Sequence, residues 1–171
     1  MGADKSLLPG RRGPWALGVA LALRDAGVED VWFVGGDRDQ LSALGPHLPD
    51  AEPGAGPLVA LATLAGHRPG RSLVVCACDL PDLDGGALGP LLDAVDDGAE
   101  AAVPEVGGRP AWSALALAPS AAEHVRIAAA AGTRSFHEGL LGVDVTRLHL
   151  PSAPFLDVDG PLGPPVHGSE G

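Results

Sequence analysis

Residues 73–81 read Leu-Val-Val-Cys-Ala-Cys-Asp-Leu-Pro, and this stretch decides the fold of the chain. The first six residues form a short apolar run, which is typical of a buried strand, and Asp79 follows directly after it. In open α/β sheets ligands collect at the carboxyl ends of the strands, where a hard cation that carries phosphates takes one or two carboxylates. Asp79 is therefore a candidate magnesium ligand. Alternatively it caps the following helix, because Asp is an ordinary N-cap residue.

The amino terminus is the second informative stretch, since residues 1–8 read Met-Gly-Ala-Asp-Lys-Ser-Leu-Leu. A loop that holds phosphates needs glycine, so that the backbone can approach the oxygen atoms, and a cation aimed at them. Gly2 and Lys5 supply these two parts. Lys5 is also the only lysine in the chain. Its compact ammonium is a positive point charge that can follow a mobile phosphate.

Together the two stretches resemble the signature of the MobA-like nucleotidyltransferases, the family of molybdenum cofactor guanylyltransferase. In that signature a Leu-Ala-Gly-Gly loop continues into Arg-Met-Gly-x-Asp-Lys-x-Leu-Leu, and residues 1–8 match only its second half. Further matches follow in the family's order, at Gly56-Pro57-Leu58, Arg109-Pro110, Gly132-Thr133-Arg134 and 155–159. The resemblance therefore covers nearly the whole chain.

The resemblance implies an α/β fold with a Rossmann-like, mostly parallel sheet and helices on both faces, of the nucleotide-diphospho-sugar transferase type. We expect one nucleotidyltransferase domain over residues 1–159 and a proline- and glycine-rich, disordered tail over 160–171. In the family the first strand lies at the centre of the sheet, between the strands at Val31 and Leu73. Because that strand and the first half of the loop are missing here, we expect Met1 to be an internal methionine of a longer protein.

Apolar periodicity and turn residues predict the individual elements. We expect helices over about 14–26, 58–64, 86–95 and 120–131, the last with Ser120 as its cap, and a further short helix that begins at Arg134. Strands are expected at 31–34, 73–78, 101–103, 114–117 and 155–159, with a loop over 46–57 and a tight turn over 107–110.

The resemblance also implies the reaction and the nucleotide site. GMP would pass from GTP to the terminal phosphate of molybdopterin, with release of pyrophosphate and with Mg²⁺ as the cofactor. Lys5 and Asp79 would be the catalytic residues and would bind the nucleotide together with Gly2. Gly56 and Pro57 would shape the pocket for the guanine, although a plain junction between a loop and a helix is an equal interpretation of these two residues.

The remaining candidate residues concern the metal and the second substrate. Asp157 and Asp159 alternate with apolar residues and so share one face of the expected strand, and Asp159 could pair with Asp79 on the metal. The family has asparagines at these two positions. Arg109 and Arg134 are candidates for binding the pterin phosphate, with ordinary exposed arginines as the alternative.

Composition limits the partners. The chain has 171 residues and a formal net charge of −11, which argues against binding to a nucleic acid polymer and favours a small anionic ligand. The resemblance implies that the small substrates are GTP and molybdopterin. No segment predicts a membrane span or a secretory signal, so we expect a cytoplasmic protein. The resemblance implies transient contact with cofactor-delivery proteins or molybdoenzymes. Cys76 and Cys78 lack a second cysteine pair, and we interpret them as packing residues.

Two other functions stay open. A neighbouring enzyme of the same fold could use CTP or another phosphorylated acceptor, because the sequence does not fix the base. Alternatively, the incomplete loop would permit a non-catalytic module that binds a nucleotide or a pterin.

Overall fold

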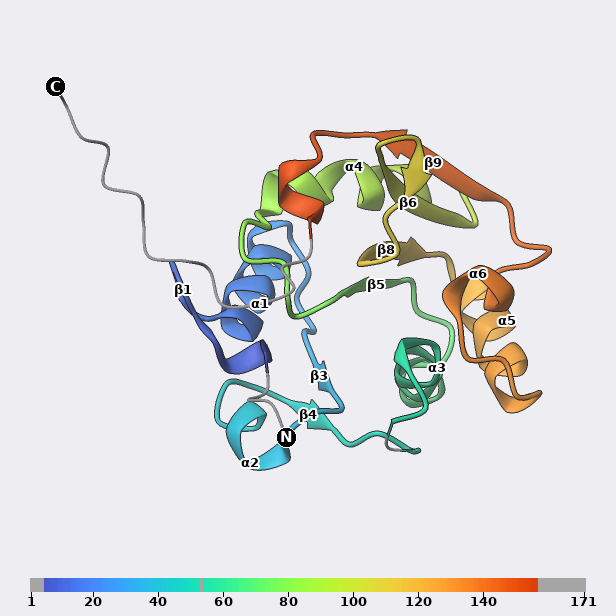
Figure 1. The fold of residues 1–171 in the computed structure, drawn as a ribbon. Coiled ribbons are helices and arrows are strands. Elements are labelled where there is room, and N and C mark those ends of the chain that lie inside the picture. Colours follow the sequence, from blue (N-terminus) through green and yellow to red (C-terminus); the bar gives the residue numbers. More distant parts are fainter. Residues whose placement is uncertain (1–4, 53, 157–171) are drawn as a thin grey trace, which may run out of the picture.

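The computed structural model describes residues 5–52 and 54–156 of the chain (Figure 1). Its helices are α1 (Trp15–Asp25), α2 (Arg38–Leu41), α3 (Pro57–His67), α4 (Gly85–Asp96), α5 (Pro119–Ala130) and α6 (Phe136–Gly139), with short 3-10 turns η1 (Lys5–Leu7) and η2 (Ala153–Phe155). Its strands are β1 (Pro9–Gly10), β2 (Gly13–Pro14), β3 (Phe33–Val34), β4 (His47–Leu48), β5 (Leu73–Cys76), β6 (Ala101–Val106), β7 (Arg109–Pro110), β8 (Ala114–Leu117) and β9 (Val145–His149).

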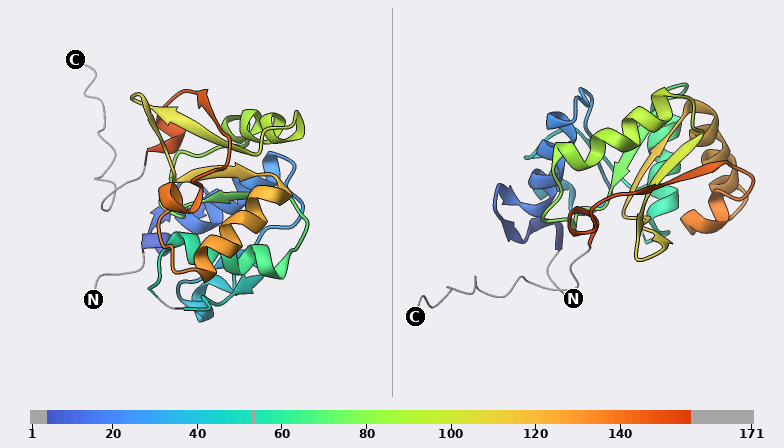
Figure 2. Two further views of the ribbon diagram at one scale, coloured as in Figure 1. Left: turned by 90° about the vertical axis from the view of Figure 1, so that its right-hand side faces the viewer. Right: turned by 90° about the horizontal axis from the view of Figure 1, so that it is seen from above.

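The largest sheet is built around β6 and has the order β5-β8-β6-β7, with β9 paired to the other edge of β6. Helices cover both of its faces, α4 on one side and α3 with α5 on the other (Figure 2). This is the expected α/β class.

The directions of the strands agree with the expected mostly parallel sheet, because β5, β6 and β9 run in one direction and only the return segment of β7 and β8 is reversed. Among the described ladders, β6–β9 and the separate pair β3–β4 are parallel, whereas β5–β8, β6–β8 and β6–β7 are antiparallel. The reversal follows from the two-residue hairpin that joins β6 to β7, because so short a connection favours antiparallel pairing of the chain segment that returns along β6. The turn uses Gly107 and Gly108 at φ values of 57° and 77°, which glycine adopts without steric cost. The sheet is therefore mixed.

Two apolar clusters hold the layers together. The two clusters lie on opposite faces of the sheet, because successive side chains along a strand point to opposite faces. Ala114 and Ala116 of β8 point to the cluster that contains α1 and α4, whereas Leu115 and Leu117 point to the cluster that contains α3 and α5. All four are buried. Small residues therefore face one helix layer and large residues face the other, as a strand with two covered faces requires.

Several local predictions need correction. The helix at 120–131 begins one residue earlier, because Pro119 occupies its first turn and Ala118, not Ser120, is the N-cap. The expected loop 46–57 contains β4, which pairs with β3, and α3 continues to His67. Phe155 belongs to η2 and not to a strand, while residues 157–159 lie outside the described part of the chain.

The structure also contains elements that the sequence did not predict, and it refines the position of one predicted helix. The hairpin β1–β2 was not predicted, since two-residue strands give no periodic signal. The five-residue strand β9 was also not predicted. The short helix near Arg134 is α6, and it begins at Phe136 with Ser135 as its cap. Among the residues that the structure describes, no helix is long and apolar enough to cross a membrane.

The first turn of α4 packs closely against the end of α1, and this contact can be tested. A Cβ atom at Gly85 would lie 2.8 Å from the backbone N of Ala26 and 2.8 Å from the backbone C of Asp25. We expect Gly85→Ala to lower the free energy of unfolding by about 1–3 kcal/mol, because the backbone of α1 would have to shift. Urea denaturation followed by circular dichroism measures this change.

Gly89 provides the matched control within the same helix. A Cβ atom there would have no neighbour within 4 Å, so Gly89→Ala should raise the free energy of unfolding by roughly 0.5–1 kcal/mol through the helix propensity of alanine. Equal effects of the two substitutions would contradict the packing of α4 on α1.

Candidate functional site

The structure brings Lys5 and Asp79 to the same cavity. We call it the amino-terminal cavity; its volume is about 260 Å³, and its lining consists of Lys5, Ser6, Val34, Gly35, Gly36, Leu41, Cys78 and Asp79. Val34 ends β3, and Asp79 lies just beyond the end of β5. The cavity therefore lies at the carboxyl ends of two strands, where α/β sheets bind ligands.

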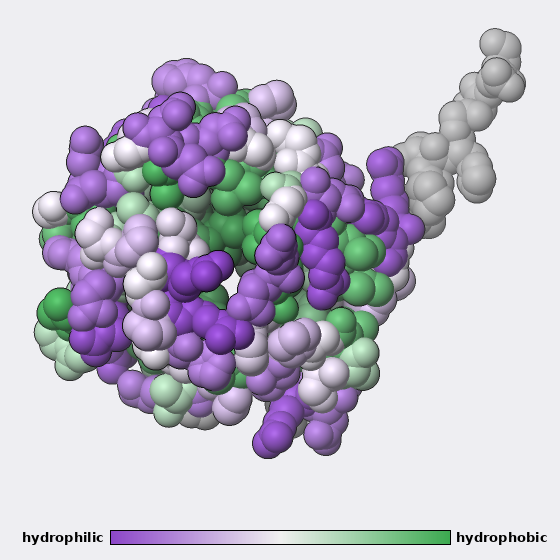
Figure 3. All heavy atoms as spheres, turned by 180° about the vertical axis from the view of Figure 1, so that it is seen from behind, coloured by the Kyte–Doolittle hydropathy of each residue, from purple (hydrophilic) through white to green (hydrophobic). Residues whose placement is uncertain are grey.

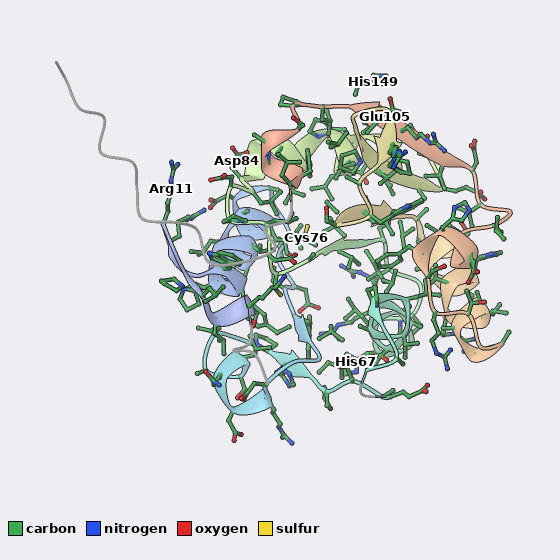
Figure 4. All side chains as sticks on the ribbon, viewed as in Figure 1. Arg11, His67, Cys76, Asp84, Glu105 and His149 are labelled. Carbon is green, nitrogen blue, oxygen red and sulfur yellow. The ribbon has the colours of Figure 1, made fainter. Side chains whose placement is uncertain are left out.

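Asp79 is held in place by its chain neighbours and does not cap α4. Leu80 is 1% exposed and anchors the residue after Asp79 in the core, while Asp79 itself is half-buried. The N-cap of α4 is Asp84, whose Oδ1 accepts a hydrogen bond of 2.8 Å from the backbone N–H of Ala87. Figure 4 shows Asp84 beside the start of this helix. The alternative interpretation of Asp79 as the helix cap is thereby wrong.

Lys5 lies in η1, a turn that is fixed by the buried Ser6 and by contacts with α1. The Leu8 carbonyl accepts a hydrogen bond of 3.0 Å from the backbone N–H of Trp15, which ties this segment to the start of α1. Trp15 is 1% exposed. Lys5 is exposed and its charge is opposite to that of Asp79, so the cavity offers one cation and one anion.

A second, more apolar cavity adjoins the first and contains the expected base-binding residues. It has a volume of about 450 Å³ and shares Val34 and Cys78 with the amino-terminal cavity. Gly56 and Pro57 lie in its wall, at the start of α3. A residue that sequence reasoning missed, Asp50, also lines it. Its carboxylate packs so closely on Gly35 that a Cβ atom there would lie 2.5 Å from Oδ1.

The sequence contains a pattern that points to Gly35 and Gly36 as site residues, but none that points to Asp50. The two glycines follow β3 at φ values of 74° and 70°, and they form part of the cavity wall where we expected only the end of a strand. A glycine pair directly after an apolar strand indicates close approach of other groups to the backbone. Asp50 gave no such signal, because the loop that carries it becomes part of the site only through the pairing of β4 with β3.

The two arginine candidates lie in different places. The Arg134 guanidinium forms an ion pair of 3.1 Å with Glu52, and its own carbonyl oxygen lies 3.5 Å from where a Gly56 Cβ would be, so Arg134 borders the loop before α3. Arg109 is exposed in the β6–β7 hairpin and lines neither cavity. Gly2 and Asp159 lie outside the described residues.

The metal-binding side chains at this cavity fit a magnesium ion that binds together with the nucleotide phosphates better than an ion held by the protein alone. Within residues 5–52 and 54–156 no group of three or more His, Cys, Asp or Glu side chains is placed to hold a metal. Asp79 is a single carboxylate at the cavity. Magnesium accepts one or two protein carboxylates and fills its other positions with phosphate oxygens and waters, so one carboxylate fits that mode.

Cys76, at the end of β5, is half-buried and packs against the apolar core (Figure 4). Burial among apolar side chains raises the pKa of its thiol to about 12, and the neighbouring Cys78 adds to the shift. A thiol in this state remains protonated at physiological pH. This agrees with its interpretation as a packing residue.

The chain was compared with known proteins. A family described as "MobA-like NTP transferase domain" matches residues 1–145, and no curated protein matches the chain. A similar solved structure is molybdopterin-guanine dinucleotide biosynthesis protein A from Archaeoglobus fulgidus, with a TM-score of 0.68 and 22% identity over 86% of this chain and 76% of that chain.

Two other similar structures extend the comparison. Rv0371C from Mycobacterium tuberculosis in complex with manganese has a TM-score of 0.65 and 20% identity over 93% of this chain and 88% of that chain. The 2-C-methyl-D-erythritol 4-phosphate cytidylyltransferase from Thermus thermophilus has a TM-score of 0.64 and 18% identity over 94% of this chain and 90% of that chain. At these identities the likeness establishes the shared fold.

The thiol of Cys76 gives a test of this part of the structure. In a Cys78→Ser variant at pH 8, we expect alkylation of Cys76 by iodoacetamide to be about 1000-fold slower than after unfolding in guanidinium. The reason is that a thiol with a pKa of about 12 has a far smaller thiolate fraction at this pH than an ordinary cysteine. Mass spectrometry measures the rates. Similar rates in the folded and unfolded chains would contradict the raised pKa of the Cys76 thiol.

Proposed function

The chain belongs to the MobA-like NTP transferase family, and we propose that it transfers GMP from GTP to the terminal phosphate of molybdopterin. The observation that carries this proposal is the position of Lys5 and Asp79 in one cavity at the carboxyl ends of β3 and β5. The adjoining cavity, with Gly56 and Pro57 in its wall, has room for the base. The likeness to a protein named for molybdopterin-guanine dinucleotide biosynthesis supports guanine as the base and the pterin as the acceptor.

In the proposed reaction an oxygen of the terminal phosphate of molybdopterin bonds to the α-phosphorus of GTP. The bond from that phosphorus to the bridging oxygen of the β-phosphate breaks, and pyrophosphate leaves with this oxygen. The attacking oxygen is already anionic, so no strong general base is needed. The protein must instead bring two anions together and stabilise the charge on the leaving oxygens.

Each of the two residues has a role in this scheme. The Lys5 ammonium lies beside the triphosphate and neutralises charge that develops on pyrophosphate as it departs. The Asp79 carboxylate would hold Mg²⁺ at the same cavity, and the manganese complex of a structural neighbour supports a divalent metal. When bound, the ion would supply positive charge to the phosphates. Gly2 would bring its backbone close to the phosphates, and Asp159 would be a second carboxylate for the metal.

The acceptor would lie on the far side of the nucleotide. Arg134 borders the loop before α3, so its guanidinium could leave Glu52 and bind the pterin phosphate. Arg109 is the other candidate for the pterin phosphate; like Arg134 it lines neither cavity. A cytoplasmic location and transient contact with cofactor-delivery proteins or molybdoenzymes accompany this proposal.

Substitution of the two charged residues tests the mechanism. We expect Asp79→Asn and Lys5→Ala each to lower the rate of pyrophosphate release from GTP and molybdopterin by at least about 100-fold, because each removes charge that stabilises the transition state. A coupled pyrophosphate assay with purified protein and Mg²⁺ measures the rate. Unchanged thermal unfolding of both variants would show that the loss is chemical.

Asp82→Asn is the matched control. Asp82 belongs to the same loop as Asp79, is exposed, and does not line the amino-terminal cavity, so this variant should keep the full rate. Retained activity in both Asp79→Asn and Lys5→Ala would refute the assigned roles, as would an equal loss in Asp82→Asn.

A cytidylyltransferase is the second candidate, and the likeness to a cytidylyltransferase of the same fold favours it. Pyrophosphate release with each of the four nucleoside triphosphates separates the two. We expect the highest kcat/KM with GTP, whereas a preference for CTP would overturn guanylyl transfer but retain nucleotidyl transfer. Binding of GTP with no release of pyrophosphate from any nucleotide would indicate a non-catalytic binding module.

A further inference from the structure

Two successive glycines form part of the wall of the amino-terminal cavity, and other residues must hold their conformation. Gly35 and Gly36 follow β3 at φ values of 74° and 70°, and both line the cavity that contains Lys5 and Asp79. Glycine loses more backbone freedom on ordering than any other residue. A fixed wall at this place therefore requires contacts that restrain the glycine pair.

Residues 47–50 restrain Gly35 from three directions. The backbone N–H of Gly35 donates a hydrogen bond of 2.9 Å to the Leu48 carbonyl. The carbonyl oxygen of Gly35 accepts a hydrogen bond of 2.9 Å from Nε2 of His47. The Asp50 carboxylate packs on the Cα atom of Gly35, where a Cβ atom would lie 2.5 Å from Oδ1. Of these three contacts, only that of His47 is a hydrogen bond donated by a side chain.

The His47 ring is committed to this one contact. The Gly35 carbonyl can only accept, so Nε2 carries the proton, and Nδ1 of the neutral ring has only a lone pair. Nδ1 is buried and has no hydrogen-bond partner among residues 5–52 and 54–156. A polar atom buried without a partner costs free energy, and an apolar side chain would avoid that cost. Stability alone therefore does not explain an imidazole at this position.

The restrained residues belong to both cavities of the site. Gly35 and Gly36 line the amino-terminal cavity, whereas Asp50 is the only charged residue in the described lining of the adjoining cavity. Seen from behind, the molecule is hollowed near its centre, with apolar side chains inside the hollow and hydrophilic ones around it (Figure 3). A few placed polar groups orient a ligand in such a site. Residues 47–50 hold two of those places.

We propose that His47 is a positioning residue for the nucleotide, which through the Gly35 carbonyl holds the Gly35-Gly36 wall ready for the phosphates. This inference rests on the proposed function. His47 lines neither cavity, so it acts without touching the nucleotide. Without the ring's N–H, binding of the nucleotide must itself order the glycine pair, and affinity falls. The chemical step changes little, because Lys5 and Asp79 stay in place.

Two substitutions separate the hydrogen bond from the bulk of the ring. His47→Phe keeps an aromatic ring and removes the donor, whereas His47→Gln keeps a donor close to the position of Nε2. We expect His47→Phe to raise the Kd and the KM of GTP about three- to tenfold, the effect of one neutral hydrogen bond, and to change kcat by less than about twofold. In His47→Gln all three constants should stay within about twofold of the unsubstituted chain. Calorimetric titration with Mg²⁺ and GTP gives the Kd.

NMR and thermal unfolding provide readouts that do not depend on turnover. The ¹⁵N shifts of the His47 ring should place its proton on Nε2. Hydrogen exchange of the Gly35 amide should be about three- to tenfold faster in His47→Phe and close to normal in His47→Gln. The Tm of His47→Phe should change by less than roughly 3 °C, since the substitution removes the unpartnered ring nitrogen together with the bond.

Four results would overturn the role of His47. These are an unchanged Kd in His47→Phe, an equal loss of affinity in His47→Gln, a ring proton on Nδ1, and a large fall of Tm in His47→Phe, which would assign the ring to the stability of the fold. Failure of the proposed function has a different signature. If the unsubstituted chain binds GTP but releases no pyrophosphate, guanylyl transfer fails and the Kd series still decides on His47. Absence of GTP binding would overturn both.

Discussion

The structure depends on one constraint: β3 and β5 must end at the same place. The residues that follow them, Gly35-Gly36 and Cys78-Asp79, can then form one wall of the amino-terminal cavity, with Lys5 completing it. Neither strand reaches this position by pairing with the other, because they lie in different sheets. Their positions are set by separate contacts, β4 for β3 and β8 for β5, and by the helix layers on both sides. Small displacements of either strand would separate the cation from the carboxylate.

The sequence predicts those parts of this arrangement that have a local signal. The apolar run at 73–78 and the alternation of small and large residues at 114–117 predict buried strands, and the structure has both. The sequence also predicts that Lys5 and Asp79 lie together, because its motifs assign both residues to one phosphate site. Pairing directions had no local signal, since β5 and β8 are far apart in sequence and their ladder depends on the hairpin before β8. Asp50 was missed for the same reason, as its loop reaches the site only through β4.

The most direct test of the shared phosphate site uses the fact that Lys5 is the only lysine of the chain. A GTP analogue with an acyl group on its terminal phosphate transfers that group to an amine held beside the phosphates. With Mg²⁺ present, the account predicts acylation of Lys5 in the peptide map, competition by GTP, and loss of the label in Asp79→Asn. Labelling that is equal with and without the Asp79 carboxylate, or that falls only on the terminal amine, would contradict it.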